Sequence, residues 1–111
     1  MIIRPGKKGD IPQVFDLIKE LAEYEKAHDK VSNTVERLEE DGFGPNPVYE
    51  LFVAENENKI VGIALTYYRF STWRGKVMYL EDLIVKEHMR RKGIGKKLFD
   101  MVLDHAKVTN C

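Results

Sequence analysis

The stretch Arg90-Arg91-Lys92-Gly93-Ile94-Gly95 decides the fold of this chain. An apolar run typical of a strand, residues 78–85, precedes it, and a run with helical periodicity, residues 96–107, follows it. Two glycines two positions apart leave backbone N–H groups uncovered where the helix begins, and such a helix terminus attracts anions. Five nearby side chains add positive charge: Arg90, Arg91, Lys92, Lys96 and Lys97. The sequence therefore predicts a site for a group that carries phosphate.

The apolar pattern upstream predicts a strand and two helices. A short strand at residues 1–4 comes first, and an amphipathic helix with Asp10 as its N-cap covers residues 11 to about 26. A second, shorter helix follows Ser32-Asn33-Thr34, and its buried side is formed by Val35, Leu38 and Phe43.

Three strands are predicted between this helix and the basic stretch, at residues 49–55, 60–70 and 76–85. The connections are short and polar, which favours an antiparallel meander. We expect the whole chain, residues 1–111, to form one domain of mixed α/β (α+β) class. Its order is strand, helix, helix, strand, strand, strand, helix.

Composition fits an ordinary soluble globular domain, with 43% apolar and 32% charged residues. Eighteen basic and eighteen acidic residues cancel, so no global field favours nucleic acid or membrane. The signs are nevertheless segregated, because acids gather in residues 16–41 and bases in residues 86–97. An anionic ligand at one end and a cationic ligand at the other would suit this layout, although two solvated helix faces would also produce it.

Three features that the sequence lacks indicate where the protein is located: a disulfide, a membrane-spanning segment and a signal peptide. The single cysteine, Cys111, permits no disulfide within the chain, and no run approaches the roughly 20 apolar residues that span a bilayer. The first residues lack the apolar segment of a signal peptide. We expect a cytoplasmic protein without a membrane partner. The spacing of His28, His88 and His105 predicts no metal site.

Known phosphate-binding motifs do not fit the glycine pair. The Walker A pattern G-x-x-x-x-G-K-[ST] cannot be laid over Gly93-Ile94-Gly95-Lys96-Lys97. A dinucleotide fingerprint fails as well, because only two glycines are present and the preceding strands are predicted antiparallel. A loop that merely starts a helix remains the alternative.

The strand Tyr79-Leu80-Glu81-Asp82-Leu83-Ile84-Val85 followed by Arg90-x-x-Gly93-x-Gly95 resembles the acetyl-CoA motif of GNAT-type N-acetyltransferases, Arg/Gln-x-x-Gly-x-Gly/Ala. Within that superfamily the chain is most similar to the diamine acetyltransferases, the spermidine/spermine and thialysine N-acetyltransferases. Four blocks carry the resemblance: Ile3-Arg4-Pro5, Leu17-Ile18-Lys19-Glu20-Leu21-Ala22-x-Tyr24-Glu25, Glu39-Glu40-Asp41-Gly42-Phe43-Gly44 and Tyr79-Leu80-Glu81-Asp82.

The resemblance implies that acetyl-CoA is the cosubstrate. Backbone N–H groups of the loop would hold its pyrophosphate, and the strand that precedes the loop would pair with its pantetheine arm. A backbone N–H there would polarise the thioester carbonyl. The implied cofactor-binding residues are Leu83, Ile84, Val85, Arg90, Arg91, Lys92, Gly93, Ile94, Gly95 and Lys96.

The resemblance also implies direct attack by a primary amine, without an acyl-enzyme. An alkyl ammonium has a pKa near about 10, so a base must first remove a proton. Glu81 matches the family's strand carboxylate and is the predicted base. Asp82 points to the opposite face of a regular strand, so both acids face one site only if a bulge intervenes. Asp82 is assigned to binding a distal ammonium, and exposed acids on a strand are the alternative for both.

Acceptor binding is assigned to the acidic first helix, where Glu20, Tyr24 and Glu25 match the family's block. Trp73 matches a family aromatic that lines the acceptor channel, although a lone Trp in a turn also serves as a packing anchor. Ser71 stands where the family has an acidic residue, which weakens the case for long polyamines. A small diamine or a thialysine-like amino acid fits equally well.

In the family, a fifth strand, another helix and a final hairpin follow the position of Cys111. They supply an Asn that contacts the cofactor and a Tyr that protonates the leaving thiolate. We expect either a fragment of a longer enzyme or a chain completed by a partner. The expected consequences are weak or no transfer by the isolated chain and association into a homodimer or a larger assembly.

Two other functions compete with an N-acetyltransferase. The first is a noncatalytic acyl-CoA-binding module. The second is a small RNA- or DNA-binding protein that uses residues 86–97, but this segment has no interleaved aromatics and the net charge of the chain is zero. We therefore expect no nucleic-acid partner.

Overall fold

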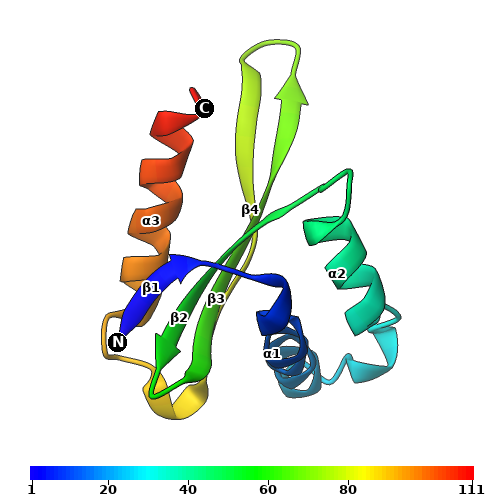
Figure 1. Ribbon diagram of the computed structural model, residues 1–111, viewed down its shortest axis with the longest axis vertical. Helices are drawn as coiled ribbons and strands as arrows, with labels where there is room; N and C mark the ends of the chain where they lie inside the picture. The colour runs from blue at the N-terminus through cyan, green and yellow to red at the C-terminus, as the bar shows by residue number, and fades with distance from the viewer.

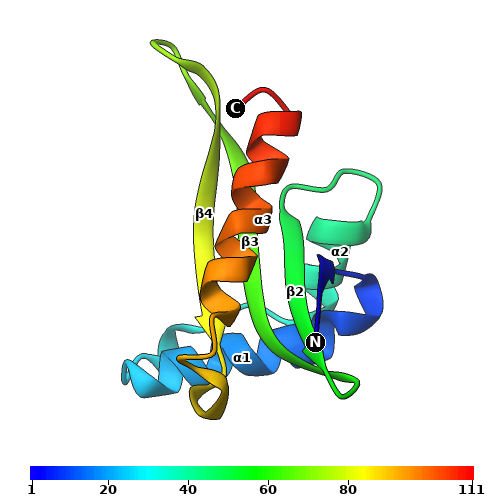
Figure 2. The same cartoon turned by 90° about the vertical axis from the view of Figure 1, so that its left-hand side faces the viewer.

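A computed structural model describes residues 1–111 apart from the side chain of His28. Within the described chain, four strands form one antiparallel sheet in the order β1-β2-β3-β4 (Figure 1). Helices α1 and α2 cover one face of this sheet and α3 covers the other (Figure 2). The predicted mixed α/β class and the order of the elements are confirmed.

The main elements are β1 (Ile2–Pro5), α1 (Ile11–Tyr24), α2 (Val35–Phe43), β2 (Glu50–Asn56), β3 (Lys59–Ser71), β4 (Gly75–Val85) and α3 (Ile94–Val108). Short 3-10 helices that the sequence pattern did not predict lie at Lys8–Asp10, His28–Lys30 and Glu87–Met89. Helix α1 ends two residues before the predicted boundary, and Lys26 has a left-handed φ of 57° that no α-helix continues through. No helix of the described residues is both long and apolar enough to cross a membrane.

Two apolar cores lie on opposite faces of the sheet. On one face, α1 and α2 pack their buried side chains, among them Val14 and Leu38, against the strands. On the other face, α3 packs Ile94, Leu98 and Val102. The predicted burial of Leu38 is confirmed, but Phe43 lies at the end of α2 and is 37% exposed, so its predicted burial is wrong.

Local turn and cap signals act as predicted in two places. The Thr34 hydroxyl accepts a hydrogen bond from the backbone N–H of Arg37 and so caps α2. Glu57 and Asn58 both have left-handed φ values, 52° and 65°, which fit the tight turn that joins β2 to β3.

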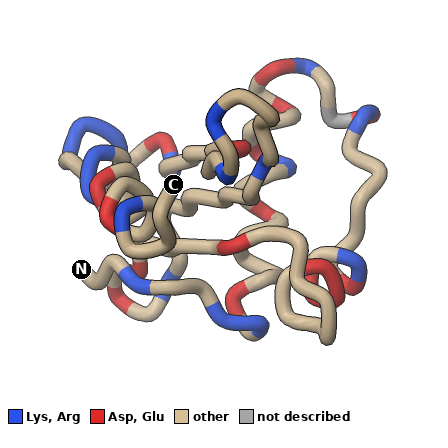
Figure 3. Tube along the Cα trace, turned by 90° about the horizontal axis from the view of Figure 1, so that it is seen from above, with Lys and Arg blue, Asp and Glu red and all other residues tan. Residues whose placement is uncertain are grey.

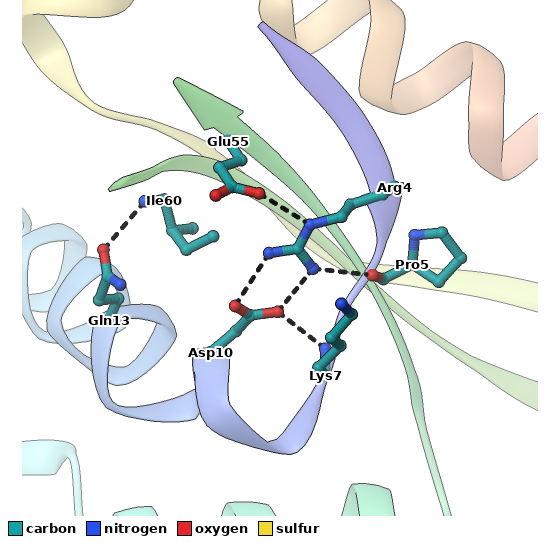
Figure 4. Close-up of polar contacts among 7 residues, drawn as sticks. All are labelled: Arg4, Pro5, Lys7, Asp10, Gln13, Glu55 and Ile60. Carbon is teal, nitrogen blue, oxygen red and sulfur yellow. Dashed lines mark hydrogen bonds and ion pairs between the residues drawn. The ribbon is translucent and has the colours of Figure 1, made fainter. Parts of the chain in front are cut away.

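Asp10 stands at the predicted N-cap of α1, but its side chain does not cap the helix within the described structure. Its carboxylate instead accepts two hydrogen bonds from the Arg4 guanidinium, at 2.8 and 3.1 Å, and one from the backbone N–H of Lys7 (Figure 4). Arg4 also donates to Glu55 at 3.0 Å. The cap assignment is therefore corrected: a charged partner on β1 competes successfully for the carboxylate and ties the start of α1 to β1 and β2.

A second polar contact fixes α1 farther along the sheet. The Gln13 amide oxygen accepts the backbone N–H of Ile60 at 2.9 Å (Figure 4). This bond lies near a β2–β3 bulge, where the register shifts between Ala54 and Glu55. α1 is thus bound to both β1 and β3 by side chains, in addition to its apolar face.

Substitution Asp10→Ala leaves the part-buried Arg4 guanidinium with Glu55 as its remaining partner, and we expect it to destabilise the fold by about 1–2 kcal/mol in urea unfolding. Arg4 holds the pKa of Asp10 below its ordinary value. The contribution of the Arg4–Asp10 pair to the free energy of unfolding is therefore fully present when the pH is above the ordinary aspartate pKa. It is lost as the pH falls through the lowered pKa of Asp10. The exposed control Asp16→Ala should change stability by less than about 0.5 kcal/mol. Equal effects of the two substitutions would contradict the anchoring role of Arg4 and Asp10.

Candidate functional site

β4 contains an extra residue at Glu81. Leu65 of β3 pairs with Asp82, and the next residue of β3, Thr66, pairs with Leu80. Two residues of β3 therefore face three residues of β4, which defines a β-bulge. The regular alternation of β4 is broken at this point, so the condition under which Glu81 and Asp82 share one site is met.

The bulge changes which helix each half of β4 faces. Before it, Met78 and Leu80 pack against the core beneath α3. After it, Ile84 packs against the core beneath α1, although an unbroken strand would place Leu80 and Ile84 on one face. Asp82 is two residues before Ile84 on the regular part of β4, so both side chains point to the same face of the sheet. It therefore lies on the α1 face and not beneath α3.

Asp82 lies half-buried in an acidic group. Burial raises its pKa, and the negative charges of Glu81 and Glu25 raise it further. Glu25 immediately follows the last residue of α1, and Glu81 is exposed on β4. We call Glu25, Glu81 and Asp82 the acidic triad. The fold thus brings together acids that are more than fifty residues apart in the chain.

The backbone between β4 and α3 forms a concave turn. Arg91 and Gly93 both have left-handed φ values, 66° and 77°, and Gly93 is the N-cap of α3. The first helical hydrogen bond runs from the N–H of Lys97 to the carbonyl of Gly93. The preceding N–H groups of Ile94, Gly95 and Lys96 are the uncovered donors of a helix N-terminus, and they suit a phosphate group. We call residues 90–96 the anion cradle.

The cationic side chains of the cradle differ in what they contact. Arg90 donates from Nε to the carbonyl of Val85 at 3.2 Å, which fastens the turn to the end of β4. Lys96 pairs through Nζ with Asp100 at 2.9 Å on the outside of α3. Arg91 and Lys92 are exposed. Arg90 therefore shapes the cradle, while Arg91 and Lys92 offer their charge to solvent and to a ligand.

A cavity of about 410 Å³ lies between the C-terminal half of α1 and the start of the cradle. It is lined by Glu20 and Tyr24 of α1 together with Val85 and Arg90. Side chains predicted for the acceptor and side chains predicted for the cofactor thus share one cavity.

The end of β4 offers backbone groups to a ligand. Among the described strands β4 pairs only with β3, so its other edge has no strand partner. Lys86 donates its N–H to the carbonyl of Val61, so by antiparallel alternation the backbone groups of Ile84 also point to β3, whereas those of Leu83 and Val85 point outward. Arg90 occupies the carbonyl of Val85, so the N–H of Val85 and the backbone groups of Leu83 are the ones open to a ligand. Leu83 is 41% exposed.

Charge is distributed unevenly around the sheet. Figure 3 shows acidic residues gathered in the helix at the lower right, whereas Lys and Arg occur on several sides of the molecule and are mixed with acids at the left. In α2, the acids Glu36, Glu39, Glu40 and Asp41 outnumber the single base Arg37. The predicted acidic region is therefore present in space, but the basic residues are not confined to one end.

The profile of the Acetyltransferase (GNAT) family matches residues 11–111. The chain belongs to this family. It is 41% identical to a thialysine N-epsilon-acetyltransferase of Bos taurus, over 100% of this chain and 70% of that protein. It is 36% identical to a spermidine/spermine N(1)-acetyltransferase-like protein 1 of Homo sapiens, over 98% of this chain and 17% of that protein.

A solved structure gives the same result for the fold. An aminoglycoside acetyltransferase from an uncultured soil metagenomic sample, in complex with sisomicin, superposes with a TM-score of 0.76 at 26% identity. The match covers 97% of this chain and 70% of that chain. Because the chain belongs to the GNAT family, it is an acetyltransferase.

Trp73 is the predicted acceptor residue that this GNAT chain does not bring to the acidic triad. It lies in the turn between β3 and β4, at the end of a projecting hairpin, and is 94% exposed (Figure 2). Trp73 and Glu81 are eight positions apart along mostly extended chain, a span of about 25 Å. Glu20, Tyr24 and Glu25 lie at the opposite end of the sheet, around the C-terminus of α1 (Figure 1).

Sequence reasoning missed Thr66, a buried polar residue that pairs with Leu80 directly beside the bulge. It is 1% exposed, and its hydroxyl finds no hydrogen-bond partner among the described residues. Its only sequence signal is a polar residue that ends the apolar run of β3. His88 and His105 join no cluster of three potential metal ligands in the described part of the chain, and the side chain of His28 lies outside it.

The two glycines of the cradle provide a matched test. An alanine at position 93 meets no atom within 4 Å, but it must keep a φ of 77°. We expect Gly93→Ala to cost about 1–2 kcal/mol through backbone strain alone. Gly95 lies in the first turn of α3, where an added methyl group would meet only Val85, at 3.9 Å, so Gly95→Ala should raise stability by up to about 1 kcal/mol. Thermal unfolding of both variants checks the signs, and two effects of the same sign would contradict the left-handed cradle.

Proposed function

We propose that this protein transfers an acetyl group from acetyl-CoA to a primary amine of a small polyamine or of a lysine-like molecule. The amine attacks directly while both substrates are bound. The observation that carries this proposal is that β4 joins the acidic triad to the anion cradle. One end of the strand is suited to a cation and the other to a phosphate.

The cradle fits the pyrophosphate of acetyl-CoA. The free N–H groups at the start of α3 would donate to its oxygens, and Arg91 and Lys92 would neutralise its charge. The open backbone groups of Leu83 and the N–H of Val85 would pair with the pantetheine arm. Acetyl-CoA supplies the thioester, and a backbone N–H of this edge would stabilise negative charge on its carbonyl oxygen.

The acidic triad fits the amine. A primary ammonium is attracted by three carboxyl groups, and it must lose a proton before its nitrogen attacks. Glu81 is the proposed base, because it is exposed on the strand beside the cofactor edge. Glu20, Tyr24, Glu25 and Asp82 would hold the amine from the side of α1. The relatives named for thialysine favour a lysine-like acceptor.

Calorimetry with acetyl-CoA, followed by a product assay with a panel of diamines and lysine analogues, tests this function. Glu81→Gln should lower the transfer rate by about 10²- to 10⁴-fold and leave acetyl-CoA binding unchanged, because it removes a base and no phosphate contact. Glu57→Gln, in the turn between β2 and β3, is the matched control and should keep the wild-type rate. Binding of acetyl-CoA without transfer to any amine would instead indicate a noncatalytic acyl-CoA-binding module.

We infer that the protein also forms a homodimer through the surface of α3 and the part of the β4 edge that precedes the bulge, which leaves residues 83–85 free for acetyl-CoA. Phe99 and Leu103 of α3 are large apolar side chains exposed by 41% and 43%. Light scattering should show a dimer that Leu103→Lys converts to a monomer. Val108→Lys, on a different side of α3, is the control and should leave the dimer intact. A monomeric wild-type protein at all concentrations would contradict this inference.

A further inference from the structure

The cavity between α1 and the anion cradle is lined by charges of both signs. Glu20 and Glu23 line it from the last two turns of α1, and Lys86, Glu87 and Arg90 line it from the opposite side. Among the described residues, none of these five side chains forms an ion pair with another side chain. A cavity of about 410 Å³ with a few convergent charges is suited to a small polar ligand that carries both signs.

The backbone of Lys86 is fixed by hydrogen bonds on both of its sides. Its N–H donates to the carbonyl of Val61 at 2.9 Å, and its carbonyl accepts the N–H of Met89 at 2.9 Å. Met89 packs in the core beneath α3 and anchors the 3-10 helix Glu87–Met89. The ammonium group of Lys86 therefore extends into the cavity from a segment that the fold holds in place.

The two walls of the cavity favour opposite charges. The carbonyl groups at a helix C-terminus carry partial negative charge, and the last turn of α1 contains no basic residue to offset it. Glu20 and Glu23 add full negative charges on this side, which therefore favours a cation. On the opposite wall the two bases Lys86 and Arg90 outweigh Glu87, so this side favours an anion.

We propose that this cavity binds the α-amino-acid end of a lysine-like acceptor, with the α-carboxylate beside Lys86 and the α-ammonium beside Glu20 and Glu23. Lys86 thereby selects an amino acid over a diamine, because a diamine offers no carboxylate to pair with its charge. A polyamine would bring a further cation toward Lys86 and be repelled. This inference rests on the proposed function and chooses between its two classes of acceptor.

The cavity lies within reach of the proposed position of the thioester. Val85 lines the cavity, and the open backbone groups of Leu83 lie two residues back along β4, about 7 Å away. Five bonds join the α-carbon of lysine to its side-chain nitrogen, a span of about 6 Å when extended. An amino acid held in the cavity can therefore place its side-chain amine at the edge of β4 that is assigned to acetyl-CoA.

Three acceptors that differ in their head groups test the proposal: L-lysine, cadaverine, which lacks the carboxylate, and ε-aminocaproate, which lacks the α-ammonium. With acetyl-CoA and the full chain, kcat/KM should be higher for lysine than for either analogue by about 10-fold or more. Lys86→Gln should lower the ratio of kcat/KM for lysine to that for cadaverine by about 10-fold. Glu23→Gln should instead lower the ratio for lysine to ε-aminocaproate.

Two further variants serve as controls. Lys86→Arg keeps the positive charge and should keep the preference for lysine over cadaverine, which separates recognition of the carboxylate from a structural role. Lys59→Gln removes an exposed lysine at the start of β3 and should match the wild type with all three acceptors. Thermal unfolding of each variant verifies that it is folded under the assay conditions.

The outcomes separate the inference from the function on which it rests. Use of cadaverine as well as or better than lysine by the wild type would overturn the inference and leave the acetyltransferase function in place. An unchanged ratio of lysine to cadaverine in Lys86→Gln would do the same. Absence of transfer from acetyl-CoA to every amine by the wild type would remove both.

Discussion

The register shift at Glu81 is the constraint on which both the core and the candidate site depend. Up to Leu80, β4 sends its apolar side chains beneath α3, and from Asp82 onward the even-numbered positions face α1. Without the extra residue, Asp82 would be buried under α3 and Ile84 would leave the core beneath α1. One inserted residue therefore lets a single strand complete two cores and present a carboxyl group beside the end of α1.

The two ends of α1 show opposite electrostatic arrangements. At its start, the carboxylate of Asp10 is paired with Arg4, so its pKa is lowered and its charge stabilises the fold. At its end, Asp82 faces Glu25 and Glu81, so its pKa is raised and its charge destabilises the fold. The anchored end holds the helix in place against the repulsion at the other. A site that collects like charges is suited to a cationic ligand, because binding of the cation relieves the repulsion.

Element order and the anion cradle were predictable because both depend on local signals. Helical spacing located α1 and α3, and the spacing of Gly93 and Gly95 located the cradle. The bulge was not predictable, because the residues around Glu81 alternate acceptably in either register and the pairing with β3 decides between them. The role of Asp10 was misread for a similar reason: Arg4 is a tertiary partner that the local cap pattern does not reveal.

The carboxyl carbon chemical shift of Asp82, followed by NMR across the acid pH range, tests the central claim most directly. The proximity of Asp82 to Glu25 requires the bulge, since it depends on Asp82 facing α1. We expect the pKa of Asp82 to lie above that of an ordinary aspartate in the wild type and to fall in Glu25→Gln, with no change in the control Glu36→Gln. An ordinary pKa that does not respond to Glu25→Gln would contradict the account.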